Sequence, residues 1–238
     1  MLLVSPFIGS LLGVLIRRLP QDEPVMWARS ACPRCGTRLA PGDLMPVLSF
    51  LVLRGRCRQC RRQIDRFHLW IELAAVGVVL WVILAEREPT MFADCVLGWV
   101  LLALAWTDLE TMLLPDALTL PLILAGFAEA WWFDPTMLPD RAIAAAIGWG
   151  AFAGLAGLWR RLHGIDALGA GDAKLLAAGG AWVGAEQLPW IVFLAALIGI
   201  AVALAQHGRK LGSRQQIAFG PWLALAIWLL RLYPDMMG

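Results

Sequence analysis

The sequence is poor in charged residues. Asp, Glu, Lys and Arg make up 16% of its 238 residues, whereas an ordinary soluble domain has about 25%. Hydrophobic residues make up 60%. This composition excludes a typical soluble globular protein and favours a chain that lies largely within a lipid bilayer. The formal net charge is only +2, so the charge balance does not indicate a nucleic-acid partner, and we expect none.

The sequence also lacks a typical secretory signal at its start. No basic residue precedes the first apolar stretch, Arg17 and Arg18 follow it directly, and no small-residue cleavage site is present. A signal peptide has its basic residues before the apolar stretch and its cleavage site after it. We therefore expect residues 1–16 to form a first transmembrane helix whose N-terminus lies outside the cytoplasm.

Eight apolar runs are long enough, or nearly so, to cross a hydrocarbon core of about 30 Å, which requires about 20 residues of helix. They lie at residues 1–16, 69–84, 91–107, 117–133, 141–159, 173–184, 188–206 and 217–232. The fourth run contains Pro121, which a membrane helix tolerates where neighbours satisfy the freed carbonyl. We predict an all-α, polytopic membrane bundle of about eight transmembrane helices.

Basic residues lie almost entirely on one side of this predicted bundle. If eight spans alternate in direction, 17 of the 20 Lys and Arg residues fall in or beside the loops 17–68, 160–172 and 207–216. The loops on the opposite side are mostly acidic. By the positive-inside rule the basic loops are cytoplasmic, so both termini are expected on the periplasmic side.

Four of the five cysteines form two Cys-x-x-Cys pairs, Cys32 with Cys35 and Cys57 with Cys60, in the loop 17–68. Two such pairs supply four thiolates for a tetrahedral ion, as in a structural zinc ribbon. A reducing cytoplasm disfavours disulfides, and a loop of about fifty residues has little core of its own. We predict a structural zinc site, with a redox pair or metal-free thiols as the alternatives. The surrounding arginines either offset its charge or meet anionic lipid headgroups.

Two aspartates lie at the cytoplasmic ends of predicted spans. Asp108 follows the third run, and Asp172 ends a Gly-x-Gly-Asp motif, with Gly169 and Gly171, at the start of the sixth. Ionisable groups at membrane depth are costly and by default indicate function. Two nearby carboxyl groups cannot both ionise, so one can polarise a peptide carbonyl while the other takes a proton from water. The sequence therefore predicts an aspartic peptidase with Asp108 and Asp172 as its catalytic pair.

Other residues near these aspartates are candidates for supporting roles. Gly169 and Gly171 permit unusual backbone angles and the close approach of a substrate strand. Asp116 is expected to be an N-cap because it lies at a predicted helix start. Lys174 either acts on Asp172 as a nearby cation or extends to the membrane interface.

Glycines recur at roughly one-turn spacing in the fifth and sixth runs. They are Gly148, Gly150, Gly154, Gly157, Gly179, Gly180 and Gly184. Small residues at this spacing are typical of tightly packed membrane helices. The alternative is a pair of loosely held helices that part to admit a helix of the substrate.

Taken together, these segments resemble the type IV prepilin peptidases, also called leader peptidase/N-methyltransferases, over nearly the full length. The matching segments are Gly9-Ser10-Leu11-Leu12, Arg17-Arg18-Leu19-Pro20, Pro46-Val47-Leu48-Ser49-Phe50, Arg54-Gly55-Arg56-Cys57, Glu72, Asp108 with Leu114-Pro115-Asp116, and Gly169-Ala170-Gly171-Asp172-Ala173-Lys174. The resemblance implies Asp108 and Asp172 as the catalytic pair. It also implies cleavage of prepilins or type II secretion pseudopilins after a glycine, at the cytoplasmic face of the bacterial inner membrane. The expected parts are the first helix (1–16), the four-cysteine loop (17–68) and the peptidase domain (69–238).

The resemblance further implies that the new N-terminal amine is methylated with S-adenosylmethionine as cofactor. The sequence departs from the family pattern at Gly13, where Asn is usual, and at Leu44-Met45, where Asn-Ile is usual. It also has Phe67-His68 where Tyr-Pro is usual. These changes remove hydrogen-bonding groups that could hold a polar cofactor, so a peptidase without methyltransferase activity is the alternative.

Two more distant alternatives remain. A presenilin-like intramembrane protease shares the Gly-x-Gly-Asp motif but is not expected to carry the four-cysteine loop. A membrane transporter or scaffold could use paired acids to move protons or to bind a partner.

Overall fold

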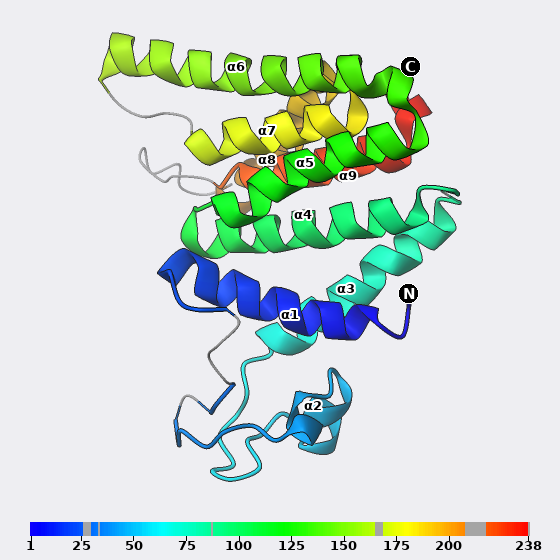
Figure 1. Cartoon of the computed structure of the whole chain (residues 1–238). Coiled ribbons are helices and arrows are strands. Elements are labelled where there is room, and N and C mark those ends of the chain that lie inside the picture. The colour runs from blue at the N-terminus through cyan, green and yellow to red at the C-terminus, as the bar shows by residue number, and fades with distance from the viewer. Residues whose placement is uncertain (26–29, 33, 87, 165–168, 208–217, 238) are drawn as a thin grey trace. The chain divides into compact units, whose positions relative to one another are not determined.

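The computed structural model describes residues 1–25, 30–32, 34–86, 88–164, 169–207 and 218–237. The chain divides into two compact units, residues 1–86 and residues 87–238. Helices account for nearly all the regular structure of the described residues (Figure 1). Four basic residues of the predicted cytoplasmic side, Arg29, Arg209, Lys210 and Arg214, lie outside the described residues, as does residue 217, where the eighth run begins.

The first unit is built on two packed helices, α1 (Ser5–Arg18) and α3 (Phe67–Leu84). A Cβ atom at Gly9 would lie 2.6 Å from the Cα atom of Glu72, so only glycine permits the two backbones to approach this closely. Because α3 packs on α1, the helix that we grouped with the peptidase domain belongs to the first unit. The proposed division of activities between the parts stays a prediction.

The segment between these two helices contains the four cysteines and little regular structure. It includes the short helices η1 (Leu19–Gln21), η2 (Pro41–Leu44) and α2 (Leu48–Val52). Two isolated antiparallel bridges join Ala31 to Arg38 and Arg56 to Gln63. Each bridge closes the turn that holds one Cys-x-x-Cys pair.

The second unit is a helix bundle with α7 at its centre. The helices are α4 (Met91–Thr111), α5 (Asp116–Phe133), α6 (Leu138–His163), α7 (Ala170–Val183), α8 (Leu188–His207) and α9 (Gly220–Leu232), with the short helices η3 (Pro135–Met137) and η4 (Pro234–Met237). Helix α7 packs against α5, α6, α8 and α9, and Figure 1 shows it (yellow) between α6 and α9. Its Ala- and Gly-rich sequence suits this position, because small side chains let several backbones approach closely.

The prediction of an all-α chain is confirmed for the described residues, and each of the eight apolar runs coincides with a helix. Four of these helices are long and apolar enough to cross a membrane, at Phe67–Leu84, Met91–Thr111, Pro135–His163 and Leu188–Ala205. The helix Gly220–Leu232 is apolar but shorter. Helix α5 continues through Pro121, as the sequence predicted.

The structure separates the glycines of α6 into two groups. A Cβ atom at Gly148 would lie 2.9 Å from the carbonyl oxygen of Leu176. By contrast, Gly150, Gly154 and Gly157 have no described atom within 4 Å of the Cβ position. The close-packing interpretation is therefore confirmed at Gly148 and wrong for these three residues, which face away from the bundle.

Candidate active site

Asp108 lies in the last turn of α4 and is buried, with 5% of its surface exposed. Its Oδ2 atom accepts a hydrogen bond of 3.0 Å from the backbone N–H of Gly220, the first residue of α9. A Cβ atom at Gly220 would lie 2.7 Å from the same oxygen. A larger residue at this position would displace the carboxyl group, and the hydrogen bond holds Asp108 against the N-terminus of α9.

Asp172 lies in the first turn of α7, three residues after the N-cap Gly169. A Cβ atom at Gly169 would come within 3.1 Å of the Asp172 carboxyl group, and one at Gly171 within 2.8 Å of the Leu114 Cβ atom. The space left by the missing side chains of the two motif glycines is therefore occupied by Asp172 and Leu114. The contact with Leu114 brings the segment that follows Asp108 against the start of α7.

The two carboxyl groups lie close enough to interact electrostatically. Asp108 comes from the end of one helix, whereas Asp172 and Gly220 come from the first turns of α7 and α9. Helix N-termini carry a partial positive charge, which stabilises nearby carboxylates. The fold therefore brings near one another two acids that lie far apart in the sequence, with Asp172 in the first turn of α7 and Asp108 against the first residue of α9.

Lys174 and Asp116 form an ion pair beside these acids, with 2.5 Å between Nζ and Oδ1. The expectation that Asp116 is an N-cap is wrong, because Pro115 occupies that position and Asp116 is the first residue of α5. Its carboxylate instead reaches across to Lys174 of α7. The pair is partly exposed, so its contribution to stability is small, but it links the first turns of α5 and α7.

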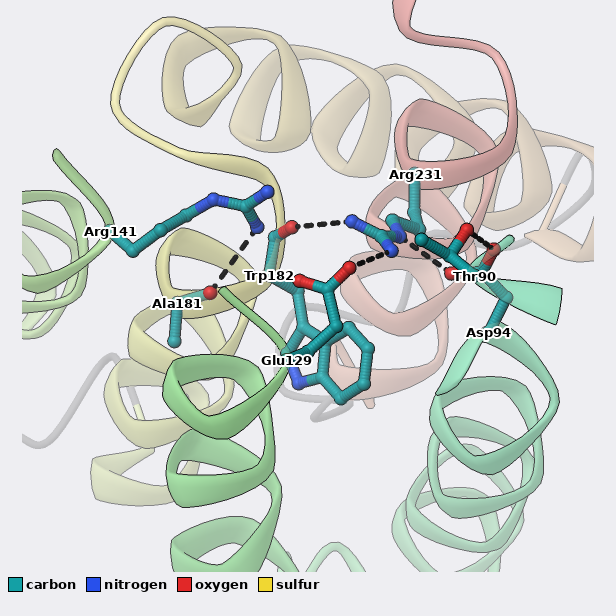
Figure 2. Close-up of polar contacts among 7 residues, drawn as sticks. All are labelled: Thr90, Asp94, Glu129, Arg141, Ala181, Trp182 and Arg231. Carbon is teal, nitrogen blue, oxygen red and sulfur yellow. Dashed lines mark hydrogen bonds and ion pairs between the residues drawn. The ribbon is translucent and has the colours of Figure 1, made fainter. Parts of the chain in front are cut away.

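A buried cluster of charged residues lies elsewhere in the second unit (Figure 2). Arg231 donates hydrogen bonds of 2.6 Å from Nε to Asp94 and of 2.6 Å from its terminal nitrogen to Glu129. It also donates one of 3.2 Å to the carbonyl oxygen of Trp182. All three charged residues are at most 8% exposed. The cluster joins α4, α5, α7 and α9.

Sequence analysis missed this cluster, although a signal was present. Asp94, Glu129 and Arg231 are ionisable residues inside otherwise apolar runs, a feature that indicates pairing or function. Asp94 precedes Asp108 by 14 residues on α4, which is about 21 Å at 1.5 Å per residue. The cluster is thus distant from the paired aspartates, and its contacts fit a structural role.

The four cysteines of the first unit form a single cluster. Their sulfur atoms all lie within 4.8 Å of one another, and those of Cys32 and Cys60 are 3.8 Å apart. A tetrahedral zinc ion with Zn–S bonds of about 2.3 Å places its ligands about 3.8 Å apart. The cluster therefore fits a zinc ion that is bound by four thiolates.

The two Cys-x-x-Cys turns have matching backbones. The N–H of Gly36 donates to the carbonyl of Cys32 at 2.9 Å, and the N–H of Arg61 donates to that of Cys57 at 3.0 Å. Both donor residues have a positive φ, 68° for Gly36 and 59° for Arg61. The repeated geometry points the two thiols of each pair toward the same centre.

A second polar cluster in the first unit surrounds Glu72, its one buried acid among the described residues. The carboxylate accepts a 2.7 Å hydrogen bond from the backbone N–H of Val47, and Ser10 lies close enough to stabilise the same carboxyl group. Gly13, where the resemblance led us to expect asparagine, packs against His68. Ser10, Val47 and Glu72 belong to three separate segments of the family resemblance, and these segments therefore meet at one place.

Two protein-family models match the chain, one on each unit. The family model described as Bacterial Peptidase A24 N-terminal domain matches residues 3–86, nearly the whole first unit. The model described as Type IV leader peptidase family matches residues 95–204, which include both aspartates. No solved structure matches the chain at a significant level.

Relatives named prepilin leader peptidase/N-methyltransferase align with almost the whole chain. The protein from Aeromonas hydrophila is 36% identical over 98% of this chain and 89% of its own length. Those from Burkholderia pseudomallei and Pseudomonas aeruginosa are 37% and 31% identical, over 91% and 99% of this chain and 79% and 90% of their own lengths.

Proposed function

Because the chain belongs to the type IV leader peptidase family, we propose that it is a prepilin leader peptidase with Asp108 and Asp172 as its catalytic pair. The observation that carries this proposal is that two acids lie within electrostatic reach of each other where α4 ends and α7 begins. Two acids of like charge placed together at membrane depth are costly, and function is the usual reason for keeping them.

The proposed reaction is peptide-bond hydrolysis by a shared-proton pair. The ionised carboxyl group takes a proton from the attacking water, while the protonated one donates a hydrogen bond to the scissile carbonyl. The water oxygen bonds to the carbonyl carbon, the C–N bond breaks, and the leaving amine takes the proton that the first carboxyl group accepted from the water. The hydrogen bond from Gly220 holds the Asp108 side chain in one orientation, so the pair is preorganised for this exchange.

We place the site at the cytoplasmic face of the bacterial inner membrane, with all eight apolar helices crossing and both termini periplasmic. Arg160, Arg161 and His163 occupy the last turn of α6, close in sequence to the start of α7 with Asp172. By the positive-inside rule this end of the helices is cytoplasmic. Prepilins or type II secretion pseudopilins, cut after a glycine, are the substrates that the family implies.

In the first unit we propose a structural zinc ion and an N-methyltransferase site. Four thiolates leave a zinc ion no open position, so its role there is to stabilise the loop. The residue best suited to the methyltransferase is Glu72, whose carboxylate would hold a cationic part of S-adenosylmethionine or accept a proton from the new N-terminal amine. The cofactor, when bound, supplies the methyl group. A mature pilin without the added mass of one CH₂ in mass spectrometry would instead indicate a peptidase alone.

Cleavage of a co-expressed prepilin tests the peptidase proposal. We expect Asp108→Asn and Asp172→Asn each to abolish leader removal, since each removes one member of the pair. Glu110→Gln is the matched control, because Glu110 is an exposed acid two residues beyond Asp108 in α4, and this variant should cleave normally. Leader removal that survives both Asn substitutions would leave the transporter or scaffold alternative.

A further inference from the structure

A cavity of about 840 Å³ in the first unit has four arginines among its nine lining residues. Its basic lining residues are Arg34, Arg54, Arg62 and Arg66. Asp65 is the one acid in the lining, and its Oδ2 atom is already paired with Arg17 at 2.9 Å. The cavity therefore carries a strong excess of positive charge.

These four guanidinium groups have no side-chain hydrogen bond or ion pair with any described residue. Other arginines of the same loop do have one, since Arg58 donates two hydrogen bonds to Asp43, of 2.9 and 2.7 Å. Four cations that line one cavity with a single acid, itself paired with Arg17, repel one another, and a bound anion reduces that cost. The planar guanidinium group binds phosphate particularly well because it can donate two parallel hydrogen bonds.

The surroundings of the cavity indicate a lipid phosphate in preference to a free one. Arg66 directly precedes Phe67, the first residue of a helix long and apolar enough to cross a membrane. The short helix α2, which contributes Phe50 to the cavity, exposes 62% of Leu51 and 70% of Val52. Exposed apolar side chains beside basic ones are typical of segments that lie in the membrane interface.

We propose that this cavity binds the phosphodiester headgroup of an anionic phospholipid, with the apolar side chains of α2 resting against the acyl region. Basic pockets beside the cytoplasmic ends of membrane helices bind such headgroups elsewhere. The bound lipid holds the four-cysteine loop against the membrane surface.

The test measures binding of phosphatidylglycerol to the full chain in phosphatidylcholine nanodiscs, by native mass spectrometry. The test variant combines Arg62→Gln with Arg66→Gln. The control combines Arg38→Gln with Arg56→Gln, two exposed arginines of the same loop that do not line the cavity. Loss of two cavity cations is expected to weaken binding about 30-fold, and the control should change it less than about threefold.

Three results would overturn the proposal. Equal weakening in both variants would show that only the total charge of the loop matters. Full displacement of phosphatidylglycerol by millimolar inorganic phosphate would indicate a site for a free anion. Equal affinity for phosphatidylcholine would show that the headgroup charge is irrelevant. Should the test variant not fold, Arg62→Lys with Arg66→Lys keeps the charges, and we expect it to retain binding within about tenfold of the wild type.

Discussion

Replacement of Arg231 by methionine should strongly destabilise the second unit. The substitution keeps an unbranched side chain, although a shorter and uncharged one, and removes both 2.6 Å contacts, to Asp94 and to Glu129. Breaking a buried ion pair by removing one partner costs about 3–5 kcal/mol, because the remaining charge is left uncompensated. Single polar contacts in membrane bundles measure at most about 1.7 kcal/mol, so two of them together also reach about 3 kcal/mol. We therefore expect a loss of about 3 kcal/mol.

The assay is the free energy of unfolding from a detergent-denaturant titration in mixed micelles. A compensated variant provides the control, in which Arg231→Met is combined with Asp94→Asn and Glu129→Gln, so that no charge is left unpaired. It should recover more than half of the loss. A loss below about 1 kcal/mol in the single variant, or no recovery in the triple variant, would refute the view that charge pairing at this cluster stabilises the bundle.

Three further outcomes are expected from the same geometry. Gly220→Ala should lower the rate of leader cleavage about 100-fold. The new Cβ atom would lie 2.7 Å from the Asp108 carboxylate, and a misplaced catalytic group costs about that much in rate. An unchanged rate would contradict the role given to this contact. Gly180→Ala should cost about 1–3 kcal/mol of stability, because its Cβ atom would lie 2.6 Å from the backbone of Ala144, whereas Gly150→Ala on the open face of α6 should be neutral or slightly stabilising. Metal analysis should find one zinc ion per chain, and its removal by a chelator should make the loop between α1 and α3 sensitive to protease. The metal site would be disproved if the purified protein contained no zinc and a chelator left the protease resistance of the loop unchanged.

The sequence was sufficient to predict the helices because the bilayer imposes long apolar runs, and each run became a helix. It was insufficient to predict which helices pack together. Asp94 and Arg231 are separated by 137 positions, and no periodicity within either run indicates that partner. Asp116 shows the same limit, since a helix-start aspartate is usually an N-cap, but here Lys174 of another helix binds the carboxylate.

For the helix contacts and the candidate site, too, the sequence predicted some features and not others. Glycine spacing predicted close packing in α6 but could not indicate which side of the helix faces the bundle. The same interpretation was therefore given to Gly148, which packs against another helix, and to Gly150, which does not. The Asp108–Asp172 pair was predicted as a hypothesis from chemistry, since two acids at the ends of apolar runs suit hydrolysis. The backbone donor at Gly220 was missed, because a single N–H group leaves no mark on the side-chain pattern.

The shortness of α9 has a consequence for water. Its 13 residues rise about 20 Å, whereas the hydrocarbon core is about 30 Å thick. If its Arg231 end lies at the outer boundary, its Gly220 end stops about 10 Å below the inner one. Asp108, whose carboxyl group accepts the hydrogen bond from Gly220, would then lie below the boundary of the hydrocarbon core, so water has to enter the bundle to reach it.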